Sequence, residues 1–278
     1  MKPAADRYAV IGNPVAHSKS PGIHARFAAQ TGERLTYDRL LAPVEGFDAT
    51  VRAFIAAGGR GLNVTVPFKL EAFGLADTLS PRAKAAGAVN TLVFSESGIH
   101  GDNTDGYGLV RDLEHNLATP LAGRRILLLG AGGAARGVVL PLLEGKPTEL
   151  AIVNRSAARA AELAVGFTAA AHTARCALSG GASDIAHGRY DVVINATAGS
   201  LDDQLPQFDA SALGQSTLAY DMMYAAQPTI FMRHAAQHGA RCADGLGMLV
   251  EQAAESFYVW RGVRPDSASV LAELRAQL

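Results

Sequence analysis

Lys69 is the last residue of a short segment, NVTVPFK, whose polar residues are spaced so that they could bind a ligand or take part in a reaction. Asn63 and Thr65 alternate with valines, and in a strand this alternation places both polar side chains on one face. Ligands of open α/β sheets bind at the carboxyl ends of strands, where Lys69 would lie. An ammonium group there could stabilise charge on a reacting oxygen or transfer a proton. The alternative is a surface lysine with a buried stem.

Two further polar segments follow, GAVNTL with Asn90 and GDNTDG with Asp102 and Asp105. Asn, Asp and Gly are also ordinary turn residues, so either segment alone is a weak sign of function. The Asp and Asn residues of GDNTDG are similar in type to those of a calcium loop, but the glycine and the bidentate glutamate of such a loop are misplaced. We therefore expect no metal site.

A fourth polar segment, GNPVAHSKSP, places Ser18 and Ser20 beside the start of a helix. Their hydroxyl groups could bind a carboxylate together with the helix amides. The alternative is that Ser20 only caps the helix while Ser18 is a solvated loop residue. The sequence does not decide between the two.

The run RRILLLGAGGAARG contains an apolar strand, a glycine-rich turn and the start of a helix. Gly130, Gly132 and Ala135 fit the pattern G-x-G-x-x-G/A of dinucleotide sites. The first position permits a tight turn, the second lets the backbone approach a pyrophosphate, and the third allows close helix packing. We predict a dinucleotide site at this turn.

The next strand, ELAIVN, ends where an NAD site would have an acidic residue for the ribose. The chain has Asn154, Arg155 and Ser156 there instead, with Arg159 one helical turn later. A carboxylate would repel a 2′-phosphate, whereas a guanidinium pairs with it. The predicted cofactor is therefore NADP, although both arginines could simply solvate a helix N-terminus.

The composition favours a compact, soluble protein. With 278 residues, of which 49% are hydrophobic and 18% charged, the length slightly favours two domains over one. The net charge of −1 gives no reason to expect nucleic acid or a membrane surface as a partner.

Cys176 and Cys242 lie far apart without metal-ligand spacing, and we expect reduced cysteines in buried strands. The N-terminal segment lacks a long apolar stretch, so we expect neither a signal peptide nor a membrane span, and a cytoplasmic location.

Secondary-structure patterns place these motifs in two α/β regions. The first has the order βαβαβ: YAVIG, a helix over 21–31, LTYDRLLA, a helix over 45–57, and GLNVTVP, followed by a hairpin that turns near Ser97 and a helix GYGLVRDLEHNL. From Arg124 the alternation resumes with RRILLLG, ELAIVN, ARCAL, YDVVINAT and STLAYDMM, as a doubly wound sheet requires. Beyond Gly239 we expect a short strand, RCADG, and two helices, within MLVEQAAESFYVWRG and VLAELRAQL. These patterns leave open which domain the last helices belong to.

Taken together, these motifs resemble the shikimate dehydrogenase family over nearly the whole chain. The segments that carry the resemblance, in family order and spacing, are GNPVAHSKSP, NVTVPFK, GAVNTL, GDNTDG, GAGGAARG, NRS, NATAGS, DMMY and DGLGMLVEQAA. The resemblance implies NADP-linked interconversion of 3-dehydroshikimate and shikimate in aromatic biosynthesis. It also implies a substrate domain of residues 1–105 and 240–278, to which the C-terminal helices return, and a Rossmann-like NADP domain of residues 106–239.

The resemblance implies roles for particular residues. Lys69 and Asp105 would form the catalytic pair. The residues that would bind the substrate are Ser18, Ser20 and Tyr224 at its carboxylate and Asn63, Thr65, Asn90 and Gln252 at its ring oxygens. Those that would bind NADP are Gly130, Ala131, Gly132, Gly133, Ala134, Asn154, Arg155, Ser156, Arg159, Thr197, Met222, Gly245 and Gly247. The partners would be small molecules, and the protein a monomer or homodimer.

Two alternatives use the same fold. One is a quinate/shikimate dehydrogenase that uses NAD, against which Arg155 argues. The other is a dinucleotide sensor without catalysis, against which the intact Lys69 and Asp105 argue.

Overall fold

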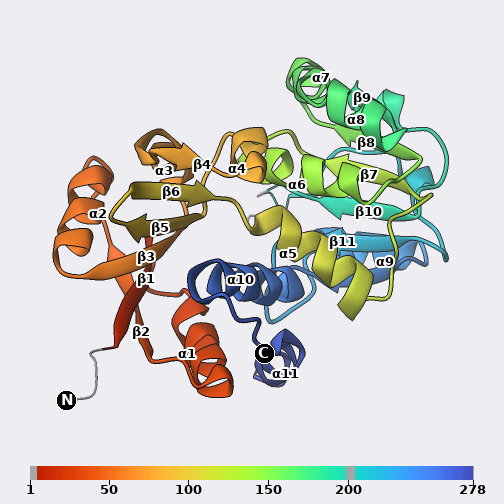
Figure 1. Ribbon diagram of the computed structural model, residues 1–278. Helices are drawn as coiled ribbons and strands as arrows, with labels where there is room; N and C mark the ends of the chain where they lie inside the picture. Colours follow the sequence, from red (N-terminus) through yellow and green to blue (C-terminus); the bar gives the residue numbers. More distant parts are fainter. Residues whose placement is uncertain (1–4, 198, 200–203, 278) are drawn as a thin grey trace. The chain divides into compact units, whose positions relative to one another are not determined.

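The computed structural model describes residues 5–197, 199 and 204–277, which form two compact units (Figure 1). The first unit comprises Met1–Gly108 and Val250–Leu274. The second comprises Leu109–Leu249 and Arg275–Leu278. The chain therefore leaves the first unit and returns to it after completing most of the second.

The first unit is built on a mixed sheet in the order β2-β1-β3-β5-β6-β4. Its strands are β1 (Asp6–Gly12), β2 (Leu35–Leu41), β3 (Gly59–Val64), β4 (Thr78–Leu79), β5 (Thr91–Ser95) and β6 (Gly98–Asp102). Strands β1, β2 and β3 are parallel, as the predicted βαβαβ order requires, whereas β5 runs antiparallel to both β3 and β6. The predicted hairpin near Ser97 is the β5–β6 turn.

Helices pack against this sheet. The helices that lie wholly or partly in the first unit are α1 (Ser20–Thr31), α2 (Phe47–Ala56), α3 (Lys69–Leu75), α4 (Pro81–Ala86), α5 (Asp105–Arg111), α10 (Leu246–Arg261) and α11 (Ser267–Arg275). One face buries Phe54 of α2 and Ala72 of α3 against Leu62 of β3. An edge-on ring contact joins Phe27 of α1 to Phe257 of α10.

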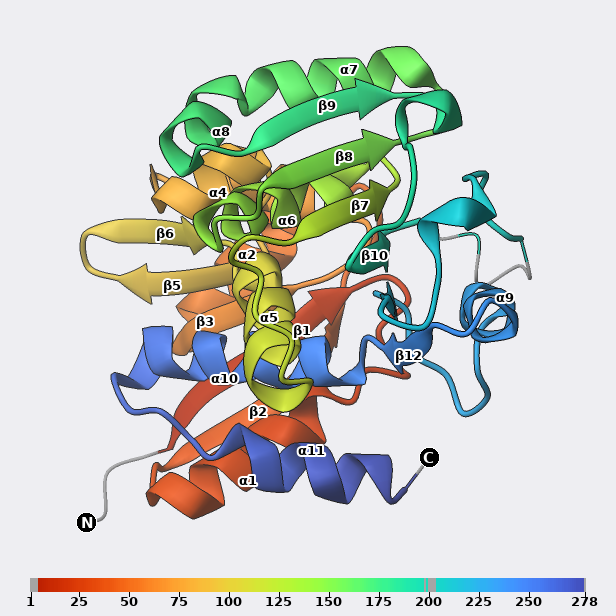
Figure 2. The same ribbon diagram turned by 90° about the vertical axis from the view of Figure 1, so that its right-hand side faces the viewer.

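The second unit contains a six-stranded sheet in the order β12-β11-β10-β7-β8-β9, with every neighbouring pair parallel. Its strands are β7 (Arg125–Leu129), β8 (Glu149–Val153), β9 (Ala177–Gly181), β10 (Val192–Asn195), β11 (Leu218–Asp221) and β12 (Arg241–Asp244). Its helices include α6 (Gly133–Glu144), α7 (Ala157–Gly166), α8 (Thr168–Ala174) and α9 (Ile230–Gln237), and Figure 2 shows β7, β8 and β9 side by side beneath α7.

This strand order is that of a doubly wound Rossmann sheet, and it confirms the predicted α/β class. The order reverses between β7 and β10, and ligands of such sheets bind where the order reverses, beyond the carboxyl ends of the strands. The glycine turn that follows β7 lies at this point.

Four local predictions need correction. Strand β3 ends at Val64, so Thr65 lies just beyond it, although its N–H still bonds to Ile11 O of β1 at 3.0 Å. The predicted helix over GYGLVRDLEHNL changes to a π-helical turn at Asp112–Asn116. Cys176 precedes β9 instead of lying in it, and Cys242 in β12 is only half-buried.

Both cysteines are free, as predicted. Among the residues that the structure describes, no helix combines the length and apolar character needed to cross a membrane.

Candidate functional site

Lys69 and Asp105 meet in the first unit. Lys69 is the first residue of α3 and Asp105 the first of α5. Lys69 Nζ lies 2.6 Å from Asp105 Oδ2, and the two side chains are 33% and 18% exposed. The pair is therefore sheltered but still open to a small molecule.

Asn90 holds the other oxygen of Asp105. Its Nδ2 donates to Asp105 Oδ1 at 2.8 Å, to Thr104 Oγ1 at 3.0 Å and to Gln252 Oε1 at 3.3 Å. Its Oδ1 accepts from the Thr104 N–H at 2.8 Å. Four predicted site residues, Lys69, Asn90, Asp105 and Gln252, are thus joined by direct contacts.

Asn63 is engaged from both ends of its amide. The Tyr37 hydroxyl donates to Asn63 Oδ1 at 2.7 Å, and Asn63 Nδ2 donates to Ser256 Oγ at 2.8 Å. Thr91 Oγ1 is a further acceptor at 3.2 Å. Burial raises the pKa of Tyr37 well above its usual range, so this hydroxyl keeps its proton and the amide keeps its orientation.

His24 of α1 lies behind Asn63 and stacks on Tyr37 with ring centroids 4.1 Å apart and an interplanar angle of 5°. It is fully buried, and neither ring nitrogen has a hydrogen-bond partner among the described residues. Burial lowers the pKa of His24 to about 3. The imidazole is therefore neutral at ordinary pH.

Ser18 and Ser20 lie at the start of α1, and the structure differs from simple helix capping. Ser20 is inside the helix, Lys19 holds the cap position without a side-chain bond, and the Ser20 N–H donates to Ser18 Oγ at 3.3 Å. Arg39 of β2 donates to the Ser18 carbonyl from Nε at 3.1 Å and from Nη2 at 2.6 Å. The loop that carries Ser18 is thus clamped to the sheet.

The predicted cofactor residues of the second unit gather at one edge of the sheet. They follow the carboxyl ends of β7, β8, β10, β11 and β12, in that order as Gly130–Ala134, Asn154–Arg159, Thr197, Met222 and Gly245–Gly247. Tyr224 belongs to the same unit. Parallel strands place their carboxyl ends together, so residues from distant segments share this edge.

The glycines of the turn have separable reasons to be glycine. Gly130 has a φ of +112°, and a Cβ there would lie 3.2 Å from Thr197 Cγ2. At Gly132 and Gly133 a Cβ would meet nothing within 4 Å, so no packing of the described protein requires these glycines. Open space beside the first turn of α6 fits a site where backbone amides bind phosphate.

A pocket of about 380 Å³ adjoins this turn and is lined by Gly130, Asn154, Arg155 and Thr197. Arg155 and Arg159 are exposed and form no ion pair with any residue that the structure describes. The segment 204–207 also lines the pocket, which the sequence did not indicate because nothing in QLPQ suggests binding. The pocket offers charge and volume for part of a nucleotide.

Two further glycines are required by close packing within this unit. A Cβ at Gly245 would lie 2.1 Å from Met222 O, and one at Gly247 would lie 2.0 Å from Asp112 Oδ1. Packing alone therefore explains these glycines, and their role in binding NADP stays a prediction. Ala198 and Ser200 of the NATAGS motif lie outside the described residues.

No group of three or more His, Cys, Asp or Glu side chains able to hold a metal occurs in the described part of the chain.

Comparison with known proteins places this chain in one family. Residues 10–92 match the shikimate dehydrogenase substrate binding domain, residues 112–202 match shikimate / quinate 5-dehydrogenase, and residues 245–275 match the shikimate 5′-dehydrogenase C-terminal domain. A relative from Cupriavidus taiwanensis named "Shikimate dehydrogenase (NADP(+))" is 60% identical over 280 residues, which cover 99% of this chain and 95% of the relative. The chain belongs to the shikimate dehydrogenase family.

Solved structures agree with this assignment to the shikimate dehydrogenases. The structure of an Ael1 enzyme from Pseudomonas putida superposes with a TM-score of 0.91 at 47% identity, covering 97% of this chain and 98% of that one. Shikimate 5-dehydrogenase from Thermus thermophilus, solved in complex with NADP(H) and shikimate, gives 0.84 at 32% identity, covering 98% and 100%.

The sequence did not indicate the residues that brace the site in the first unit. Tyr37, Thr91 and Ser256 bond to Asn63, yet each occupies an unremarkable position in the sequence. A serine or threonine on a buried face is a weak signal, because such residues often bond to their own backbone.

Proposed function

We propose that this protein catalyses the NADP-linked interconversion of 3-dehydroshikimate and shikimate in aromatic biosynthesis. The observation that carries the proposal is the 2.6 Å ion pair between Lys69 and Asp105, oriented by Asn90. A relative named for this activity, at 60% identity over 99% of the chain, supports it.

The paired lysine and carboxylate suit the reduction of a ketone, which needs a hydride on carbon and a proton on oxygen. NADPH supplies the hydride when bound. The Lys69 ammonium stabilises the negative charge that grows on the oxygen and donates the proton from Nζ. In the oxidative direction the neutral amine accepts the hydroxyl proton. Asp105 orients the amine, since its Oδ2 lies 2.6 Å from Nζ.

The remaining polar residues of the first unit would bind the substrate. We assign the substrate carboxylate to Ser18 and Ser20, and the resemblance to the family suggests Tyr224 as a further residue for it. Asn63, Thr65, Asn90 and Gln252 would bind ring hydroxyls or the reacting oxygen. Thr65 suits this role because its half-buried hydroxyl has no hydrogen-bond partner among the described residues.

The second unit fits NADP better than NAD. Gly132 and Gly133 leave open space where backbone amides could bind the pyrophosphate. Asn154, Arg155, Ser156 and Arg159 would hold the 2′-phosphate, since guanidinium groups pair with phosphate and no carboxylate occupies this place in the sequence. Thr197, Met222, Gly245 and Gly247 would line the remainder of the cofactor.

The proposal is tested by measuring kcat/KM of the purified protein for shikimate and for quinate, each with NADP and with NAD, from the absorbance of the reduced cofactor. We expect shikimate with NADP to give the highest value. Preference for quinate or NAD would replace the proposal with a quinate/shikimate dehydrogenase. A folded protein that binds NADP without reducing it would be a sensor.

We also propose that the protein is cytoplasmic and works as a monomer or homodimer. Sedimentation velocity at micromolar concentration tests the oligomeric state, and a larger assembly would contradict it.

A further inference from the structure

We infer that Arg82 is a positioning residue for the reaction: its guanidinium fixes Asp102, and Asp102 in turn fixes the segment that carries Asp105. This inference rests on the roles proposed above for Lys69 and Asp105. Arg82 lies in the first turn of α4, and Asp102 is the last residue of β6.

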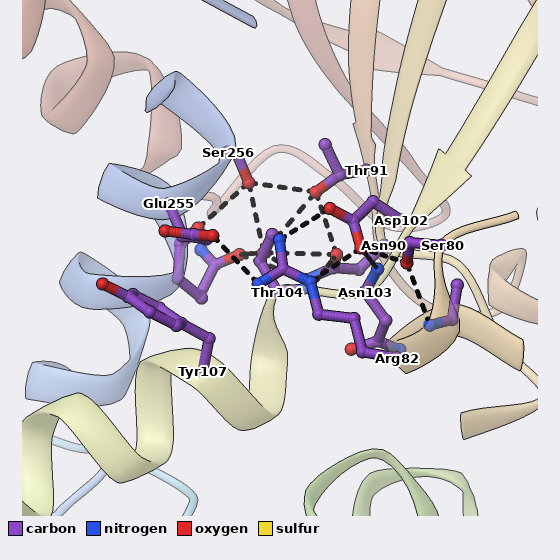
Figure 3. A network of polar contacts seen from close by, with 12 residues as sticks. Ser80, Arg82, Asn90, Thr91, Asp102, Asn103, Thr104, Tyr107, Glu255 and Ser256 are labelled. Atoms are coloured by element: carbon purple, nitrogen blue, oxygen red, sulfur yellow. Dashed lines mark hydrogen bonds and ion pairs between the residues drawn. The ribbon is translucent and has the colours of Figure 1, made fainter. Parts of the chain in front are cut away.

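Arg82 and Asp102 form a two-pronged ion pair, shown at the centre of Figure 3. Arg82 Nε lies 2.7 Å from Asp102 Oδ1 and Nη2 lies 2.6 Å from Oδ2. The Asp102 side chain is only 6% exposed. Burial alone would raise the pKa of Asp102, but the hydrogen bond and charge of Arg82 outweigh it and hold that pKa below its usual range. The Asp102 carboxylate is therefore ionised although it is almost fully buried.

Asp102 connects to the catalytic pair through two short paths. In the first, Asp102 Oδ1 accepts from the Asn103 N–H at 2.7 Å, and Asn103 Oδ1 accepts from the Asp105 N–H at 3.1 Å. In the second, the Asp102 carbonyl accepts from the Asn90 N–H at 3.0 Å, and Asn90 Nδ2 holds Asp105 Oδ1 at 2.8 Å. Displacement of Asp102 would therefore disturb both the backbone of Asp105 and the amide that orients its carboxylate.

Arg82 also holds α10, the helix that supplies Gln252. Its Nη1 donates to Glu255 Oε1 at 2.9 Å, and the Glu255 side chain is only 7% exposed. On the same helix, Ser256 Oγ lies 3.2 Å from Thr104 Oγ1. One guanidinium thus joins the end of β6 to α10, the two elements that meet at Asn90.

Arg264 offers a matched control within the same cluster. Its Nη1 donates to Glu255 Oε2 at 2.9 Å and to the Tyr107 hydroxyl at 2.9 Å. Unlike Arg82, it makes no bond to Asp102 in the described part of the chain. Loss of Arg264 removes a charge from Glu255 while leaving the paths to Asp105 intact.

The test compares Arg82→Met, Arg82→Lys and Arg264→Met by kcat, KM and the pH dependence of kcat for shikimate oxidation. We expect Arg82→Met to lower kcat about 10-fold or more, since small displacements of catalytic groups are costly. The pH profile of kcat should also change, because the pair that transfers the proton is displaced. Arg82→Lys keeps the charge without the fork, so we expect an intermediate kcat and a smaller change of the pH profile. Arg264→Met should retain the kcat and pH profile of the original protein.

The inference would be overturned if Arg82→Lys, like Arg264→Met, kept the kcat and the pH profile of the original protein. If Arg82→Met does not fold, the result for Arg82→Lys alone decides. Lys69→Met and Asp105→Asn are measured in parallel. If both remain fully active, the proposed catalytic pair itself is wrong. If both are inactive while the Arg82 variants behave like the original protein, only the role of Arg82 is wrong.

Discussion

In the first unit, Lys69, Asp105 and Asn90 are bonded to one another side chain to side chain, whereas in the second unit the turn at Gly132 faces open space and Arg155 has no ion-pair partner among the described residues. The first site is braced by the protein itself. The second consists of backbone groups and exposed arginine side chains that can bind an anionic ligand.

This difference separates stability from binding. A buried polar network rigidifies its members, and removal of one leaves the others unsatisfied. An exposed arginine without a partner contributes little to the stability of the folded protein, so its loss should lower only the affinity for the ligand. Substitutions in the two units should therefore have different consequences.

The largest expected effect is at Lys69. Lys69→Met should lower kcat by about 100-fold or more with little change in KM, as removal of a general acid–base group does. Steady-state kinetics with shikimate and NADP measure it, and the exposed Lys84→Met is the control. An unchanged kcat would exclude Lys69 from the chemical step.

Loss of both cations in the second unit should affect only the cofactor. Arg155→Ala combined with Arg159→Ala should raise the KM for NADP about 100-fold, since a hydrogen bond to a charged group contributes about 1.5–3 kcal/mol. The KM for NAD and the melting temperature should not change. The exposed Arg34→Ala provides the control, and a lowered melting temperature would show that the arginines also support folding.

His24 shows how burial of a titratable group in the first unit makes stability depend on pH. Its pKa is about 3 in the folded protein against an ordinary value of 6.5, so only the unfolded chain takes up a proton between these values. The contribution of His24 to the free energy of unfolding is fully present above pH 6.5 and is lost as the pH falls toward 3. At pH 5 the loss is about 2 kcal/mol.

His24→Phe keeps the ring stack without the titration, so it should lose about 2 kcal/mol less than the original protein between pH 7.5 and pH 5. Urea unfolding at both pH values measures the difference, with the exposed His172→Gln as the reference. Equal losses for both proteins would show that His24 is protonated in the folded state.

The smallest expected effect is at Gly132. Gly132→Ala should leave the melting temperature unchanged, because a Cβ there meets nothing within 4 Å, but raise the KM for NADP severalfold by blocking the backbone. Gly130→Ala should behave in the opposite way and lower the melting temperature, because of its φ of +112°. Equal melting temperatures for the two variants would contradict this distinction.

The sequence predicted the fold class because the relevant signals are local. Leu127, Leu128 and Leu129 form a continuous apolar run that is typical of a buried parallel strand, and the glycine turn follows at once. The observed order of the strands and the family of the chain agree with the fold class that these signals predicted.

Two Ser-Pro pairs show where local signals end. Ser80 caps α4 by accepting from the Ala83 N–H at 3.1 Å, whereas Ser20 lies inside α1. Both pairs have serine and proline in the same order at the start of a helix. The difference involves Ser18, whose carbonyl is held by Arg39 from another strand, and such contacts depend on strand order and register.

The braces of the first site could not be predicted for the same reason. Asn63 and Ser256 are 193 residues apart, and Arg82 lies at the start of a short helix, where an arginine is usually solvated. Only the folded sheet brings Asp102 to Arg82. The roles assigned to individual residues stay predictions until the variants are measured.

The return of the chain to the first unit also constrains how the protein is made. During synthesis, the β1–β6 sheet leaves the ribosome long before α10, and the intervening residues Leu109–Leu249 belong to the second unit. Nearly all of the second unit is therefore synthesised before the first unit is complete, and Asn63 can bond to Ser256 only after 193 further residues have been made. Until α10 and α11 have been made, part of the first sheet is uncovered and exposed to aggregation.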